Sequence, residues 1–187
     1  MESLNKFPSQ TASSQFVPYV TAEEISGMVS SLALTISQKY EGEDLVVIGL
    51  LKGSSFFVCD LIRQIRNVNI YLDFVLLDSV GRTKEDVGTI RLAYDIKSNI
   101  RSRNVLLVQE IIHSARGMEF LKKRLELAQP RSIEVLSLFD KPFGRTGNIK
   151  PNYIGKRVDD HFIVGYGLDL DQYGRNLKNT YYLKYPN

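Results

Sequence analysis

The chain has 187 residues, of which 43% are hydrophobic and 24% are charged. This length fits one domain that buries roughly 70% of its unfolded surface, and the composition excludes a chain that is disordered throughout. The 24 Lys and Arg residues nearly balance the 21 Asp and Glu residues, and the net charge of +3 is too small to indicate nucleic-acid binding.

Residues 1–15 are predicted to form a flexible tail, and residues 16–187 a single domain. The tail is mostly polar and lacks the apolar segment of a signal peptide. The longest uncharged apolar stretch, residues 45–51, is far too short to span a membrane. Cys59 is the only cysteine, which excludes an intramolecular disulfide and a cysteine-based metal site. We therefore expect a soluble protein of the cytoplasm.

The first predicted elements are a helix, a strand and a second helix. Thr21 and Glu24 have the spacing of a helix capping box, and the apolar residues after them recur every three or four positions. This pattern predicts a helix over residues 22–40. The apolar run 45–50 predicts a strand that is covered on both faces, and a polar turn then opens a helical pattern over residues 56–65.

The middle of the chain continues this alternation. Residues 68–76 alternate between apolar and polar side chains as a strand does, and the polar stretch 78–88 is predicted to be an exposed loop. Residues 89–93 are predicted to pair back as the return strand. A buried strand over residues 104–108 and an amphipathic helix over residues 118–127 follow.

A third buried strand is predicted over residues 132–139. Strands alternating with helices up to this point predict an α/β fold with a mainly parallel central sheet flanked by helices. Ligands bind beyond the carboxyl ends of the strands in such sheets. The turns at residues 51–55, 109–117 and 140–149 are therefore the candidate site.

The turn after the strand at 104–108 contains an acid, a histidine, a hydroxyl and a basic group before the next helix begins. Backbone amides at a helix N-terminus bind anions readily. By itself this turn is better explained as a plain connection, since any turn between a strand and a helix is polar.

Residues 108–117 align without a gap with the pattern Val-Glu-Asp-Ile-[Ile/Val]-Asp-[Ser/Thr]-Gly-x-[Ser/Thr] of the hypoxanthine-guanine type of purine phosphoribosyltransferase, although several residues differ from it. The chain resembles this family from residue 17 onward. The resemblance implies a type I phosphoribosyltransferase-like fold with a small hood from the terminal segments and a flexible lid hairpin. Three further stretches match: Leu-Leu-Lys-Gly at 50–53, Leu-Phe-Asp-Lys-Pro at 138–142, and 160–169 with Arg175 beyond it.

The resemblance also implies an activity. The 5-phosphoribosyl group of phosphoribosyl pyrophosphate would be transferred to N9 of hypoxanthine or guanine, giving IMP or GMP and pyrophosphate. Mg²⁺ would be the cofactor, and the protein would be a homodimer or homotetramer with neither nucleic acid nor membrane as a partner. The preference among hypoxanthine, guanine and xanthine stays open, because it depends on backbone geometry.

On the pyrophosphate side, the resemblance assigns Lys52, Gly53 and Arg175. The peptide bond between Leu51 and Lys52 is often cis in this family, which aims backbone amides at the pyrophosphate. The guanidinium of Arg175 has a fork of donors suited to the leaving diphosphate. Without the resemblance, Lys52 would be an ordinary turn lysine and Arg175 a surface arginine.

On the base side, the resemblance assigns Lys141 as the donor to O6 of the purine, which selects 6-oxopurines over adenine. Phe162 would stack on the base, and the backbone of Ile163 would meet its edge. Asp169 and Glu110 would hold Mg²⁺. Without the resemblance, Phe162 and Ile163 would be strand core, and Asp169 would cap a turn.

The chain departs from the family where the ribose and the five-membered ring of the purine would lie. In the family, two adjacent acids bind the ribose hydroxyls. This chain has Gln109 and Glu110 at these positions, so one of the two carboxylates is missing. His113 stands where the family has an aspartate beside N7 of the purine. An imidazole can accept a proton near neutral pH, so His113 is a candidate general base.

The 5′-phosphate loop is altered as well. Ser114 keeps the hydroxyl, but Ala115 replaces a glycine and Gly117 replaces a hydroxyl residue. If Ala115 has a positive φ, it carries a steric cost of roughly 1–2 kcal/mol. Arg116 would compensate by pairing with phosphate.

The lid would span residues 78–88 and exclude water from the reacting centre. It would contribute Ser79 to substrate binding, and Val80 stands where the family usually has tyrosine. Since the base and pyrophosphate sides match the family, we favour an enzyme with reduced turnover. The alternative is a catalytically impaired purine- or nucleotide-binding protein on the same fold.

Overall fold

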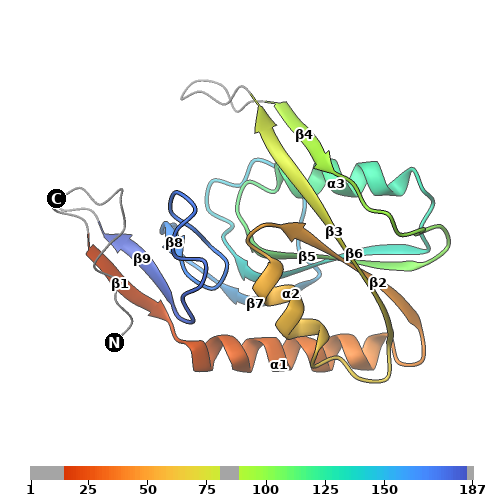
Figure 1. The fold of residues 1–187 in the computed structure, drawn as a ribbon, viewed down its shortest axis with the longest axis horizontal. Helices are drawn as coiled ribbons and strands as arrows, with labels where there is room; N and C mark the ends of the chain where they lie inside the picture. The colour runs from red at the N-terminus through yellow and green to blue at the C-terminus, as the bar shows by residue number, and fades with distance from the viewer. Residues whose placement is uncertain (1–14, 81–88, 185–187) are drawn as a thin grey trace.

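Figure 1 shows the computed structural model of the chain, which describes residues 15–80 and 89–184. The predicted tail, apart from its last residue, lies outside the described residues, as does the part of the predicted lid from 81 to 88. Ser79 and Val80 are described by their backbone only.

A six-stranded sheet forms the centre of the molecule, in the order β4-β3-β2-β5-β6-β7. Strands β3, β2, β5, β6 and β7 pair in parallel, and β4 pairs antiparallel with β3 at one edge. This confirms the predicted fold class. The strands are β2 (Asp44–Leu51), β3 (Asn69–Val80), β4 (Thr89–Tyr94), β5 (Asn104–Ile112), β6 (Ser132–Asp140) and β7 (Tyr153–Arg157).

Three helices cover the sheet. Helices α1 (Ala22–Lys39) and α2 (Ser55–Ile62) lie on one face, and α3 (Arg116–Glu126) lies on the other (Figure 1). The side chains of residues 45–48 in β2 are buried and alternate between the two apolar layers, as predicted for a strand covered on both faces. Within the described ranges, none of the helices is sufficiently long and apolar to cross a membrane.

The predicted capping box begins α1. The hydroxyl of Thr21 accepts a hydrogen bond from the backbone N–H of Glu24 (3.2 Å), and the Glu24 carboxylate accepts one from the N–H of Thr21 (2.9 Å). Two amides that have no partner within the helix are thereby satisfied.

A three-stranded antiparallel hood stands beside the sheet, in the order β1-β9-β8 (Figure 1). It consists of β1 (Gln15–Val20), β9 (Thr180–Lys184) and β8 (Ile163–Val164). The His161 ring stacks on Tyr182 with centroids 4.5 Å apart, and Tyr19 contacts both rings edge-on. These aromatic contacts anchor the segment that leads into β8.

Several predicted boundaries were wrong. Strand β5 continues to Ile112 instead of turning at residue 109, because its last residues pair with the end of β6. Strand β3 continues to Val80 instead of entering a loop at residue 78, because it pairs with the start of β4. Helix α2 ends at Ile62 and helix α3 begins at Arg116, each earlier than predicted.

Candidate functional site

Two glycines bring the turn after β2 into contact with the segment after β8. A Cβ atom on Gly53 would overlap the carboxylate of Glu110, and one on Gly167 would overlap the carbonyl oxygen of Gly53. Gly167 also has φ +95°, a backbone conformation that other residues rarely adopt. Position 167 therefore requires glycine for the two segments to meet, whereas a side chain at Gly53 would displace the Glu110 carboxylate.

The two predicted pyrophosphate cations lie together at this contact. The peptide bond between Leu51 and Lys52 is cis, as the family resemblance implies. Lys52 Nζ donates to Gln172 Oε1 (3.3 Å), and Arg175 donates to the same oxygen (3.2 Å). Gln172, which sequence reasoning missed, thus links the two cations.

Asp169 is held between the same groups. Its Oδ1 atom pairs with the Arg175 guanidinium (2.7 Å), and its Oδ2 atom accepts a hydrogen bond from the backbone N–H of Gln172 (2.9 Å). Arg175 also donates to the carbonyl oxygen of Gly167 (2.8 Å). Asp169 therefore caps the turn, which is the role expected of it without the family resemblance. It also orients the Arg175 guanidinium.

The carboxyl group of Glu110 is buried, and its Oε2 atom has no hydrogen-bond partner among the described residues. Burial raises the pKa of Glu110 to about 7; the Asp169 carboxylate adds to this rise and the Arg175 guanidinium opposes it. A substantial fraction of the protein therefore carries a neutral Glu110 at neutral pH.

The two acids fit Mg²⁺ only in combination with a substrate. Within residues 15–80 and 89–184, three or more His, Cys, Asp or Glu side chains do not cluster as a metal site would require. Mg²⁺ is commonly held by one or two carboxylates together with substrate phosphates. Glu110, with an unpartnered oxygen, and Asp169 match that donor set once diphosphate oxygens complete it.

Glu110→Gln should remove a pH dependence of stability. The folded-state pKa of about 7 lies above the ordinary value of 4.5, so the wild type holds an extra proton when folded and loses stability as pH rises through this window. The variant should be the more stable protein above about pH 7. Urea unfolding of metal-free protein across this range measures the difference, and parallel pH curves for the two proteins would contradict the prediction.

The predicted base-reading residues also lie together. The buried Lys141 pairs through Nζ with Asp160 Oδ1 (2.6 Å) and donates to the carbonyl oxygen of His161 (3.1 Å). Phe162, the next residue, has 46% of its surface exposed, whereas Ile163 is buried in β8. The Lys141 ammonium is therefore bonded to the residue that directly precedes an exposed aromatic side chain.

The predicted phosphate loop forms a small cavity at the start of α3. The cavity measures about 200 Å³ and is lined by Gln109, His113, Ser114, Ala115 and Gly117, among others. His113 and Ser114 are exposed, and the helix N-terminus offers unpaired backbone amides. Free amides at the start of a helix are groups to which an anion can bind.

Arg145 is a residue of the site that sequence reasoning missed. Its guanidinium donates to the carbonyl oxygens of His113 (3.1 Å) and Ile112 (3.0 Å), and it pairs with the buried Asp140. The loop at 140–149 thereby fixes the backbone of the phosphate loop. Neither periodicity nor a motif in the sequence marked this arginine.

Ala115 has φ +62°. It therefore adopts the left-handed backbone conformation whose steric cost was anticipated from the sequence. Ala115→Gly should stabilise the protein by about 0.5–1 kcal/mol, since relief of the left-handed penalty exceeds the entropic cost of glycine. Denaturant unfolding measures this. Ala33→Gly, in the middle of α1, is the matched control and should lower stability by about 1 kcal/mol or more. A loss of stability in Ala115→Gly would refute the prediction.

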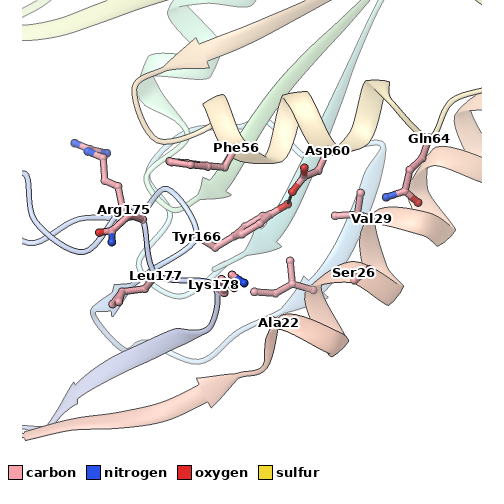
Figure 2. Close-up of a pocket in the computed structure, with 12 residues that line it drawn as sticks. Ala22, Ser26, Val29, Phe56, Asp60, Gln64, Tyr166, Arg175, Leu177 and Lys178 are labelled. Atoms are coloured by element: carbon pink, nitrogen blue, oxygen red, sulfur yellow. Dashed lines mark hydrogen bonds between the residues drawn. The ribbon is translucent and has the colours of Figure 1, made fainter. Parts of the chain in front are cut away.

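A separate cavity of about 500 Å³ lies between α1, α2 and residues 175–178. Figure 2 shows the Tyr166 hydroxyl reaching Asp60 on α2, a hydrogen bond of 2.7 Å, while the Arg175 guanidinium points away from this pair. Arg175 therefore directs its charge to the site at the strand ends rather than into this cavity.

The site at the strand ends combines the predicted phosphate loop with two cations, Lys52 and Arg175, and the buried acid Glu110. This combination is typical of an enzyme that binds a phosphorylated sugar. The family model for the phosphoribosyl transferase domain matches residues 20–171. The chain belongs to the phosphoribosyltransferase family.

Individual proteins similar to this chain belong to one branch of the family. The hypoxanthine-guanine phosphoribosyltransferase of Staphylococcus aureus is 33% identical over 158 residues, which cover 84% of this chain and 88% of that protein. A crystal structure of a hypoxanthine-guanine phosphoribosyltransferase from Bacillus anthracis has a TM-score of 0.84 and 34% identity, covering 91% of this chain and 99% of that one. A hypoxanthine phosphoribosyltransferase structure from Staphylococcus aureus has a TM-score of 0.86 and 32% identity, covering 91% and 94%. The resemblance seen in the sequence is confirmed.

Proposed function

We propose that this protein is a purine-salvage enzyme that transfers the 5-phosphoribosyl group of phosphoribosyl pyrophosphate to N9 of hypoxanthine or guanine. The products are IMP or GMP and pyrophosphate. The family and the named relatives support this reaction. The observation that carries it is the buried Lys141 ammonium, bonded to the residue before the exposed ring of Phe162.

The base is recognised by its carbonyl and by its flat face. Lys141 donates to O6, whereas adenine presents an amino donor at that position and would leave two donors opposed. Phe162 stacks on the ring, and the backbone of Ile163 meets its edge. These contacts select a 6-oxopurine.

The leaving diphosphate is bound where Lys52 and Arg175 converge. Negative charge grows on this group as the glycosidic bond breaks, and fixed cations and backbone amides at Gly53 stabilise that charge. Mg²⁺, held by Asp169 and Glu110 together with diphosphate oxygens, would neutralise further charge.

The 5′-phosphate is bound by the cavity at the start of α3, with the Ser114 hydroxyl, the backbone amides from 115 to 117 and the Arg116 side chain as donors. His113, beside the five-membered ring of the purine, accepts the proton that the ring releases as N9 attacks the ribose.

A binding protein without turnover is the second candidate. The left-handed Ala115 and the neutral Gln109 in the ribose-phosphate region favour it. Incubation with radiolabelled hypoxanthine, phosphoribosyl pyrophosphate and Mg²⁺ decides between the two. Labelled IMP supports the enzyme, whereas saturable GMP binding without product at high protein concentration supports the binding protein.

We further propose that the protein acts in the cytoplasm as a homodimer or homotetramer. The single cysteine fits a reducing compartment. The sheet edge carries an apolar groove lined by Leu51, Phe74 and the exposed side chains of Leu72 and Tyr94, a surface suited to a second copy. Light scattering of the purified protein tests the oligomeric state, and a monomer at micromolar concentration would contradict it.

A further inference from the structure

The ammonium group of Lys141 already has two partners. It carries three N–H donors; one reaches Asp160 Oδ1 (2.6 Å) and one reaches the carbonyl oxygen of His161 (3.1 Å). The backbone N–H of Lys141 donates to the carbonyl oxygen of Ile112 (2.9 Å), so the main chain is fixed as well. Only 11% of the side-chain surface is exposed. A single N–H therefore remains for a ligand.

Asp160 is the carboxylate that faces this ammonium. Lys141, and to a lesser degree His113 and His161, lower the pKa of Asp160, so it stays ionised. The neighbouring Asp140 is engaged instead by Arg145 and, at 3.8 Å, by Arg157. Among the described side chains around the ammonium, Asp160 supplies the paired negative charge.

Building on the proposed function, we propose that Asp160 is a positioning residue that makes the base site selective for 6-oxopurines. Together with the His161 carbonyl it occupies two of the three ammonium hydrogens and directs the remaining one at one carbonyl oxygen of the base. Such a fixed donor rejects a base that presents an amino group there, because two donors would then face each other. Without the carboxylate, the ammonium can rotate about its stem and this selectivity declines.

GMP and AMP are the probes, because their bases differ in this contact and their binding requires no turnover. Calorimetry gives the GMP affinity, and competition against GMP gives that of AMP. In Asp160→Asn, GMP should bind roughly tenfold more weakly while AMP changes by less than about twofold, since the charge-assisted contact from Lys141 loses its alignment and only the oxopurine makes that contact. Asp160→Glu, which keeps the carboxylate, should recover part of the loss.

Asp159→Asn removes the same charge one residue away and is the matched control; its GMP to AMP affinity ratio should equal that of the wild type. In a Lys141→Met background, Asp160→Asn should cause no further loss of GMP affinity. If Asp160→Asn fails to fold, Asp160→Ser serves as the second variant.

An unchanged affinity ratio in Asp160→Asn overturns the proposal, as does an equal loss for both nucleotides, which would indicate a purely structural role. A further loss in the Lys141→Met background overturns it too. A wild type that binds GMP no more tightly than AMP overturns the proposed function itself, an outcome distinct from these.

Discussion

Replacing Arg175 by alanine should lower kcat/KM for phosphoribosyl pyrophosphate by roughly 10²–10³-fold, the range for removal of one fixed donor at a developing charge. Arg175 is held by Asp169, Gly167 and Gln172 beside Lys52. A guanidinium held in this way needs no reorganisation as the diphosphate leaves. The loss should therefore appear in kcat as well as in KM.

Arg63→Ala is the matched control, because it removes an equal charge from the exposed far end of α2; its kinetics should equal those of the wild type. Arg175→Lys should recover only a small part of the activity, since an ammonium does not reproduce the forked donors. Thermal unfolding of each variant separates a loss of catalysis from a loss of folding. A decrease of less than about threefold in kcat/KM would show that Arg175 does not stabilise the leaving group.

Replacing His113 by aspartate should raise turnover by about tenfold or more, and replacing it by alanine should lower turnover by about 10²-fold, the lower range for a general base. The exposed His113 lines the small cavity at the start of α3, and its carbonyl oxygen is held by Arg145. Either side chain at this position can accept the purine proton. An aspartate restores the charge and reach that the family uses.

The chain has two histidines, so His161→Gln is the control for this prediction. It removes the other imidazole and should leave kcat close to that of the wild type. If His113→Asp folds but gains no activity, Ala115 or Gln109 limits the reaction instead.

Much of this protein follows from local features of the sequence. The capping box of Thr21 and Glu24 and the apolar runs of β2 and β5 depend on neighbours a few residues apart, so that periodicity alone predicts them. The motif that ends in Arg175 identified the family, because its glycines and charges recur at fixed spacing. Chain order then placed the turns at one edge of a parallel sheet.

Other features depend on residues that are distant in the sequence. Strand β1 was not predicted because its partner is β9, at the opposite end of the described chain. Strand β5 extends to Ile112 because β6 continues beside it, which places Glu110 within a strand and buries its carboxyl group. The hydrogen bonds from Arg145 to the phosphate loop also join residues that are distant in the sequence, and so does the ion pair of Lys141 with Asp160. The sequence by itself determined which chemical groups the site contains. Tertiary structure alone decided which of these groups are buried, paired or free, because desolvation and charge pairing depend on contacts across the fold.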